Sequence, residues 1–307
     1  MKQILVIHYS QSGQLTEIVN NIVSPLKKDA EVQIDYCAIE MEKPFPFPWN
    51  KKEFFGCFPE SFLQIPSKIK PLPQTIVNKK YDLIILGYQI WYLTPSIPAN
   101  SFLNTPEAKK LLHKTPVITV IGCRNMWIMA QEKMKKKLQE LQANLVGNIV
   151  LADRHLNHIS VVTIGKWMLS GKKDRVWGIF PKPGVSQKDI DESEKFGKVI
   201  ANHLPKNNFN TLQNALLQEN AVKIKPFLIT TDKRANVIFS KWAAIIFSKG
   251  EKNSKKRQFW EKIFNYYLLF AIWVIAPIVF ILFLFTYIFF IPKIKKDKKY
   301  YSSVEIK

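Results

Sequence analysis

A short polar loop near the N-terminus carries side chains and amides suited to bind a phosphate. Ser10, Ser12 and Gly13 lie between an apolar run that begins at Ile4 and a helical apolar pattern that begins at Leu15. Such a loop directs hydroxyls and backbone N–H groups to a helix N-terminus, where they stabilise an anion. It lacks the Gly-Lys-Ser/Thr ending of a nucleoside triphosphate loop and the three glycines of a dinucleotide fingerprint. The loop therefore favours flavin mononucleotide (FMN), with an ordinary serine-capped strand–turn–helix as the alternative.

Two motifs resemble the flavodoxin-like family. Ser-x-Ser-Gly-x-x-Thr over residues 10–16 is similar to that family's FMN phosphate loop, although Leu15 brings the spacing nearer the flavin-dependent reductase branch. Residues 81–98 resemble its third strand and the loop that covers the flavin ring. The resemblance implies phosphate ligands at Ser10, Gln11, Ser12, Gly13, Gln14 and Thr16. It implies ring contacts at Gln89, Ile90, Trp91, Tyr92, Thr94, Gly122, Cys123, Arg124 and Asn125.

Three side chains are candidates for catalysis beside such a flavin. Arg124 could stabilise the negative charge of a reduced flavin, and a surface or helix-capping arginine is the alternative. His155 and His158 follow the fifth predicted strand and could act as a general base near neutral pH. Plain polar loop residues are the alternative for both. A metal site is not expected, because no third ligand accompanies the two histidines.

Apolar runs and helical patterns alternate beyond the loop, which is typical of an α/β domain with a parallel sheet. We expect a first strand from residue 4 and further strands over residues 31–39, 81–87, 116–122 and 144–152. Helices are expected over residues 15–28, 126–143 and 186–203, the last with a capping box at Ser186 and Asp189. The expected fold is a flavodoxin-like, doubly wound, five-stranded parallel sheet of order 2-1-3-4-5 over residues 1–204. Its ligand crevice opens at the carboxyl ends of strands 1 and 3.

Two segments interrupt this minimal domain. Residues 41–79 are rich in proline and phenylalanine, so we expect no regular helix there, and the segment is either a loop packed on its own domain or a lid for an apolar substrate. Residues 153–183 form a second insertion that contains the two histidines. Residues 205–262 are expected to be a connecting and basic juxtamembrane region.

An uncharged stretch over residues 263–292 predicts a membrane anchor. Its core, Leu268–Ile291, would be about 36 Å long as a helix, against a bilayer core of about 30 Å. Lysines flank it on both sides, including the tail at residues 293–307. We favour a single crossing with the basic tail translocated, and a re-entrant hairpin bent near Pro277 is the alternative.

The overall charge of +21 also allows nucleic-acid binding, but no nucleic-acid motif supports it. Residues 249–307 alone hold 12 Lys and Arg against 4 Asp and Glu, which indicates contact with acidic lipid. Three cysteines without metal or disulfide spacing, and Met1 leading directly into a strand, favour a cytoplasmic location for the large domain.

The full layout resembles the dialkylresorcinol condensing enzyme family, through residues 1–19 and the segment Val120–Trp127. That resemblance implies a bacterial inner-membrane enzyme of flexirubin-type pigment synthesis. A ketosynthase partner would make a lipophilic dialkylcyclohexanedione, which this chain would oxidise with FMN to the resorcinol. The alternatives are a membrane-tethered electron-transfer protein, an NAD(P)H-quinone reductase and a non-catalytic scaffold for the ketosynthase.

Overall fold

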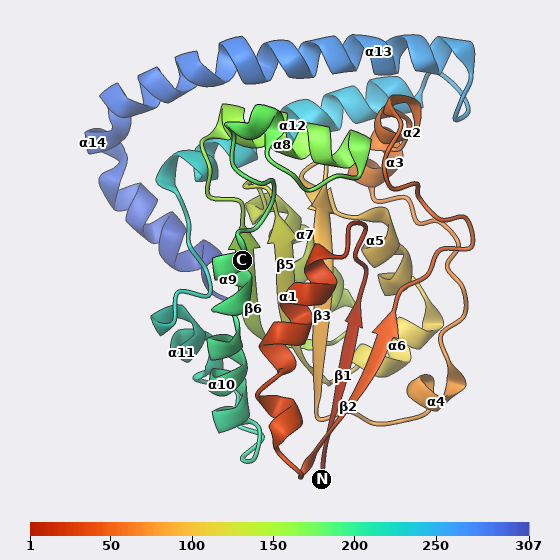
Figure 1. Cartoon of the computed structure of the whole chain (residues 1–307), viewed down its shortest axis with the longest axis vertical. Helices are drawn as coiled ribbons and strands as arrows, with labels where there is room; N and C mark the ends of the chain where they lie inside the picture. The colour runs from red at the N-terminus through yellow and green to blue at the C-terminus, as the bar shows by residue number, and fades with distance from the viewer. Residues whose placement is uncertain (307) are drawn as a thin grey trace.

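The computed structural model describes residues 1–306, and its centre is a parallel sheet. The strand order is β2-β1-β3-β5-β6, and all four pairings along this path are parallel (Figure 1). The five strands are β1 (Lys2–His8), β2 (Val32–Ala38), β3 (Leu83–Trp91), β5 (Pro116–Cys123) and β6 (Asn144–Ala152). A two-residue strand, β4 (Thr94–Pro95), pairs antiparallel with the end of β3. Taken in chain order, the five parallel strands give the predicted order 2-1-3-4-5, so the chain has the flavodoxin-like fold.

Helices cover both faces of this sheet and bury its apolar strands. One face packs against α1 (Gln14–Val23), α9 (Gln187–Asp191), α10 (Glu194–His203) and α11 (Leu212–Gln218). The other packs against α4 (Gln74–Val77), α5 (Ile97–Leu103), α6 (Pro106–Leu112) and α7 (Ile128–Glu140). The predicted apolar stripe of the first helix is confirmed, since Leu15, Ile18, Val19, Ile22 and Val23 are all buried.

Several expected boundaries were wrong, and a proline explains the first of them. The first helix ends at Val23 rather than residue 28, and a 3-10 turn, Leu26–Lys28, follows Pro25. The last helix is split into α9 and α10. Residues 41–79 contain α2 (Lys51–Gly56), α3 (Phe58–Leu63) and α4, although no regular helix was expected there. Pro59 lies in the first turn of α3 and Pro73 is the N-cap of α4, where a missing N–H breaks no helical bond.

The second insertion is also more regular than expected. It forms α8 (Asn157–Ser170) and a short 3-10 turn, Val176–Gly178. Asp153 organises the start of α8, because its two carboxylate oxygens accept hydrogen bonds from the His155 amide at 2.9 Å and the Ser160 hydroxyl at 2.8 Å.

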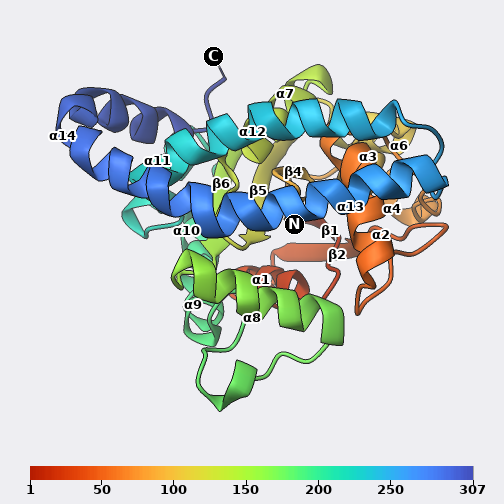
Figure 2. The same ribbon diagram turned by 90° about the horizontal axis from the view of Figure 1, so that it is seen from above.

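The C-terminal third is a set of long helices lying along one edge of the domain. It consists of α12 (Pro226–Phe247), α13 (Lys255–Phe270), a π-helical turn (Ala271–Ile275) and α14 (Ala276–Tyr301). Figure 2 shows α12 and α13 side by side across the domain, with α14 continuing beyond it. Within residues 1–306, Lys255–Tyr301 is the one helix long and apolar enough to cross a membrane by length and composition.

A buried carboxylate joins α12 to the sheet domain and gives stability a pH dependence. Asp232 is fully buried and accepts hydrogen bonds from the Ile128 amide at 2.8 Å and the Met129 amide at 3.3 Å, at the start of α7. Burial raises its pKa from 3.8 to about 7, while these two amides and Lys133 oppose the rise.

We expect Asp232→Asn to flatten this pH dependence. A carboxyl whose pKa is higher in the folded state stabilises the fold at low pH, and this stability is lost as pH rises from about 4 to about 7. The loss amounts to as much as about 4 kcal/mol. Thermal unfolding of both proteins at pH 5 and pH 8 measures the part of this loss above pH 5, which is about 3 kcal/mol. Equal pH sensitivity in the two proteins would contradict the assignment.

Candidate functional site

A cavity of about 240 Å³ opens at the carboxyl ends of β1, β3 and β5. This is the edge at which a doubly wound sheet binds its ligands. The cavity wall includes ten of the residues predicted to contact a flavin: Gln11, Ser12, Gln14, Gln89, Ile90, Trp91, Tyr92, Gly122, Cys123 and Arg124. Ser10, Gly13, Thr16, Thr94 and Asn125 do not line it.

The polar loop after β1 presents free amides at one end of the cavity. The Ser10 hydroxyl accepts hydrogen bonds from the Leu15 amide at 3.2 Å and the Thr16 amide at 3.4 Å. Gly13, with φ of +82°, is the N-cap of α1, and a glycine adopts this left-handed conformation at little cost. Within residues 1–306, the amides of Ser12, Gly13 and Gln14 have no hydrogen-bond acceptor. The loop therefore has the unpaired N–H groups that an anion requires.

Two predicted phosphate ligands have side chains that are already engaged. The Thr16 hydroxyl lies 2.9 Å from Nε2 of the buried His8, so it is turned into the domain. The Gln14 side chain donates to the Val185 carbonyl and accepts from the Val185 amide, both at 3.0 Å. Gln14 thus joins the loop to the segment before α9 and contributes an amide rather than a side chain to the site.

The first insertion closes one side of the cavity. The Gln11 side chain donates to the Pro46 carbonyl at 2.8 Å, which ties the polar loop to residues 41–49. The rings of Phe45 and Trp49 pack edge-on against Trp91, with centroids 5.0 and 5.3 Å away. Phe47, Trp49, Phe54 and Cys57 line the cavity. The residues of this insertion lie in the cavity wall, which favours a lid over a loop that only packs on its own domain.

The predicted ring-covering loop is a tight hairpin held in a strained conformation. Tyr92 and Leu93 connect β3 to β4 with φ of +49° and +64°, a region that costs most residues free energy. The Thr94 hydroxyl oxygen lies 2.8 Å from the Trp91 carbonyl oxygen and 2.9 Å from the Ser61 carbonyl oxygen, so its one hydrogen is shared between two acceptors that hold the hairpin. The Tyr92 hydroxyl donates to the Phe54 carbonyl at 2.5 Å. Thr94 therefore shapes the loop from behind the cavity.

Among residues 1–306, Arg124 is the one charged residue in the cavity wall. Its Nη1 donates to Oδ1 of Asn157 at 2.9 Å, and Asn125 donates to the same oxygen at 3.0 Å. Burial lowers the pKa of Arg124 and Asp153 opposes this, but an arginine remains a cation at neutral pH. An anionic ligand in the cavity would thus meet one fixed positive charge.

The two thiols in the wall are poor nucleophiles. Burial raises the pKa of Cys57 to about 12, and burial also raises the pKa of Cys123. Because the thiolate is the reactive form, neither residue is suited to thiol catalysis at neutral pH.

Neither predicted histidine lines the cavity. His155 is half-buried before α8, and its amide is held by Asp153. The His158 ring lies 3.0 Å from the Ile272 carbonyl and packs on Trp273, so it contacts the C-terminal helix. Their catalytic role stays a prediction. No group of three His, Cys, Asp or Glu side chains in residues 1–306 is placed to hold a metal.

Helix α8 and the loop before α9 supply wall residues that sequence reasoning did not assign to the site. Ile164, Trp167 and Met168 come from α8, and Gly184 from the loop before α9. A Cβ at Gly184 would lie 2.6 Å from Oε1 of Gln14 and 2.9 Å from the Trp167 ring. The glycine therefore allows α8 and the polar loop to close on one another.

Comparison with known proteins gives matches to solved structures only. No protein-family model and no curated protein matches the chain. A flavoprotein from Lactobacillus acidophilus in complex with FMN is 16% identical and matches 54% of this chain and 99% of its own, with a TM-score of 0.39. The NAD(P)H:acceptor oxidoreductase FerB from Paracoccus denitrificans is 10% identical. The match covers 67% of this chain and 99% of FerB, with a TM-score of 0.32. Because these sequence identities and TM-scores are low, the fold assignment depends on the strand order of the sheet and not on these matches.

Proposed function

We propose that this cavity binds FMN. The free amides after β1 suit the phosphate, the aromatic hairpin at Trp91 and Tyr92 suits the ring, and Arg124 suits the ring's polar edge. These three features lie at one edge of a sheet whose topology places ligands there. Bound FMN would supply a hydride acceptor.

We further propose that the substrate is a lipophilic cyclic dione, oxidised to the resorcinol. The observation that carries this proposal is a cavity with aromatic walls, one cation and an apolar C-terminal helix nearby. The reaction removes one proton from the carbon beside a carbonyl and one hydride from the neighbouring ring carbon, and the resulting dienone tautomerises to the resorcinol. Arg124 would pair with the oxyanion that forms when the proton leaves. A ketosynthase would supply the dione.

Anaerobic mixing of the FMN-loaded protein with a 2,5-dialkylcyclohexane-1,3-dione tests this function. We expect the flavin absorbance near 450 nm to bleach, with one resorcinol formed per flavin reduced. Bleaching by NADPH but not by the dione would instead support a quinone reductase.

We expect Arg124→Met to lower kcat/KM for the dione by about 100-fold, because one preformed cation at a developing oxyanion is lost. FMN content should be measured in the same preparation, so that loss of cofactor is separated from loss of catalysis. An unchanged kcat/KM would remove Arg124 from the reaction.

Alanine variants of His155 and His158 test the predicted base. A loss of turnover with full FMN content would support that role. Unchanged turnover in both variants would remove the two histidines from the reaction.

A further inference from the structure

Both ends of the apolar C-terminal helix are fixed to the same domain. At its beginning, Arg257 is 1% exposed and bonds the carboxylates of Glu60 at 2.6 Å and Glu261 at 3.0 Å. About two turns further on, the ring of Phe264 stacks on that of Phe58 with centroids 3.9 Å apart. Glu60 and Phe58 belong to α3, so α3 holds the start of the helix.

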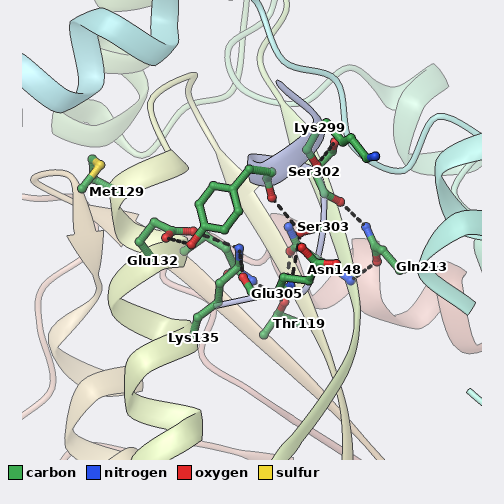
Figure 3. A network of polar contacts seen from close by, with 12 residues as sticks. Thr119, Met129, Glu132, Lys135, Asn148, Gln213, Lys299, Ser302, Ser303 and Glu305 are labelled. Atoms are coloured by element: carbon green, nitrogen blue, oxygen red, sulfur yellow. Dashed lines mark hydrogen bonds and ion pairs between the residues drawn. The ribbon is translucent and has the colours of Figure 1, made fainter. Parts of the chain in front are cut away.

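The end of the helix returns to α7 and α11. Tyr300 donates to Glu132 at 2.6 Å, and the ammonium of the buried Lys135 donates to the Glu305 carbonyl at 2.9 Å. Gln213 donates to the Ser302 carbonyl at 2.7 Å and joins the tail to Asn148 in β6 (Figure 3). These three hydrogen bonds are part-buried and involve specific partners.

The elements that hold the two ends are neighbours. Lys133 of α7 donates to the Phe62 carbonyl of α3 at 3.4 Å, and its ammonium lies 4.0 Å from the centre of the Phe62 ring. A single crossing of a bilayer core of about 30 Å would place Tyr300 on the opposite side from Arg257. The observed contacts of the two ends require them to be on the same side.

The part between the two anchors is exposed and apolar. Phe285, Ile288 and Phe289 are 76%, 73% and 82% exposed, and the most apolar 18-residue stretch has no buried residue. Figures 1 and 2 show this part projecting past the rest of the molecule before it turns back. The π-helical stretch, Ala271–Ile275, lies over the domain, where Ile272 and Trp273 contact His158. The turn comes later, within α14, which contains Pro292, and a proline inside a helix is a common cause of a bend.

We propose that this arc inserts into one leaflet of a bilayer and returns, so that the protein is monotopic and does not span the membrane. Exposed lysines stand at both ends, such as Lys256 and Lys296, where they meet acidic headgroups of one leaflet. The arc contacts α8 through His158, and α8 lines the cavity, so the cavity lies beside the lipid. The proposal does not depend on FMN binding.

Variants with one added cysteine test the topology in the full chain. The two variants are Lys256→Cys and Lys296→Cys, because both lysines are exposed. Labelling of the wild-type protein measures the background from the three native thiols. A membrane-impermeant maleimide should label both variants in inverted inner-membrane vesicles and neither in intact spheroplasts. Labelling of Lys296→Cys from the opposite side to Lys256→Cys would overturn the proposal.

A second pair of variants tests whether lipid is the partner. We expect Phe285→Lys with Phe289→Lys to lower the ratio of membrane-bound to released protein by about tenfold in sedimentation without detergent. Phe285→Leu with Phe289→Leu keeps the apolar surface and should leave the ratio unchanged. Equal sedimentation of the lysine and leucine variants would exclude insertion of this arc.

Discussion

Ser12→Asp will lower FMN affinity by about 1000-fold, whereas Ser12→Asn will keep it within about tenfold of wild type. Ser12 lines the cavity at the N-terminus of α1, beside the amides proposed to bind the phosphate. A carboxylate about 4 Å from a phosphate charge costs about 4 kcal/mol at an effective dielectric constant of about 20. Asparagine has the same size and no charge, so it isolates the electrostatic effect.

Titration of the apoprotein with FMN, followed by quenching of flavin fluorescence, measures both affinities. Equal weakening by aspartate and asparagine would mean that Ser12 acts by shape alone. Unchanged affinity in both would move the phosphate away from this loop.

Gly197→Ala will destabilise the protein by about 3 kcal/mol, which is about 10 °C in the thermal midpoint. A Cβ at this position in α10 would lie 1.8 Å from the Ile22 carbonyl oxygen and 2.9 Å from the Pro25 ring. Backbone atoms cannot yield as a flexible side chain does, so α10 must move away from α1. Since α1 begins at the polar loop, FMN affinity should fall as well.

Gly165→Ala is the matched control, because Gly165 is also within a helix and a Cβ there would meet nothing within 4 Å. Alanine favours helix over glycine by about 1 kcal/mol, so this variant should be as stable as wild type or more so. Equal midpoints for the two variants would show that α1 and α10 are not packed as described.

The sheet and its ligand edge could be predicted from the sequence because the strands are continuous apolar runs. Residues 144–152 match β6 at both ends, and the order of all five parallel strands is as expected. Serine and glycine after β1 likewise predicted a loop at the N-terminus of α1 whose amides could meet an anion, and its binding of phosphate stays a prediction.

The sequence could not decide whether residues 41–79 form a lid, and it could not predict the fixed tail, because both depend on contacts between distant segments. Nothing local to Gln14 indicates that its side chain will pair with Val185, and Thr16 is turned inward by His8. The apolar stretch indicates a membrane by its composition alone. Its topology depends on Arg257 meeting Glu60 and on Lys135 meeting Glu305, pairs separated by 197 and 170 residues.

Flavin content is the most direct test of the account. The full chain, purified in detergent and incubated with FMN before gel filtration, should elute yellow, with absorbance maxima near 375 and 450 nm and about one FMN per chain. A folded but colourless protein, which neither retains FMN nor quenches its fluorescence, would contradict the central claim.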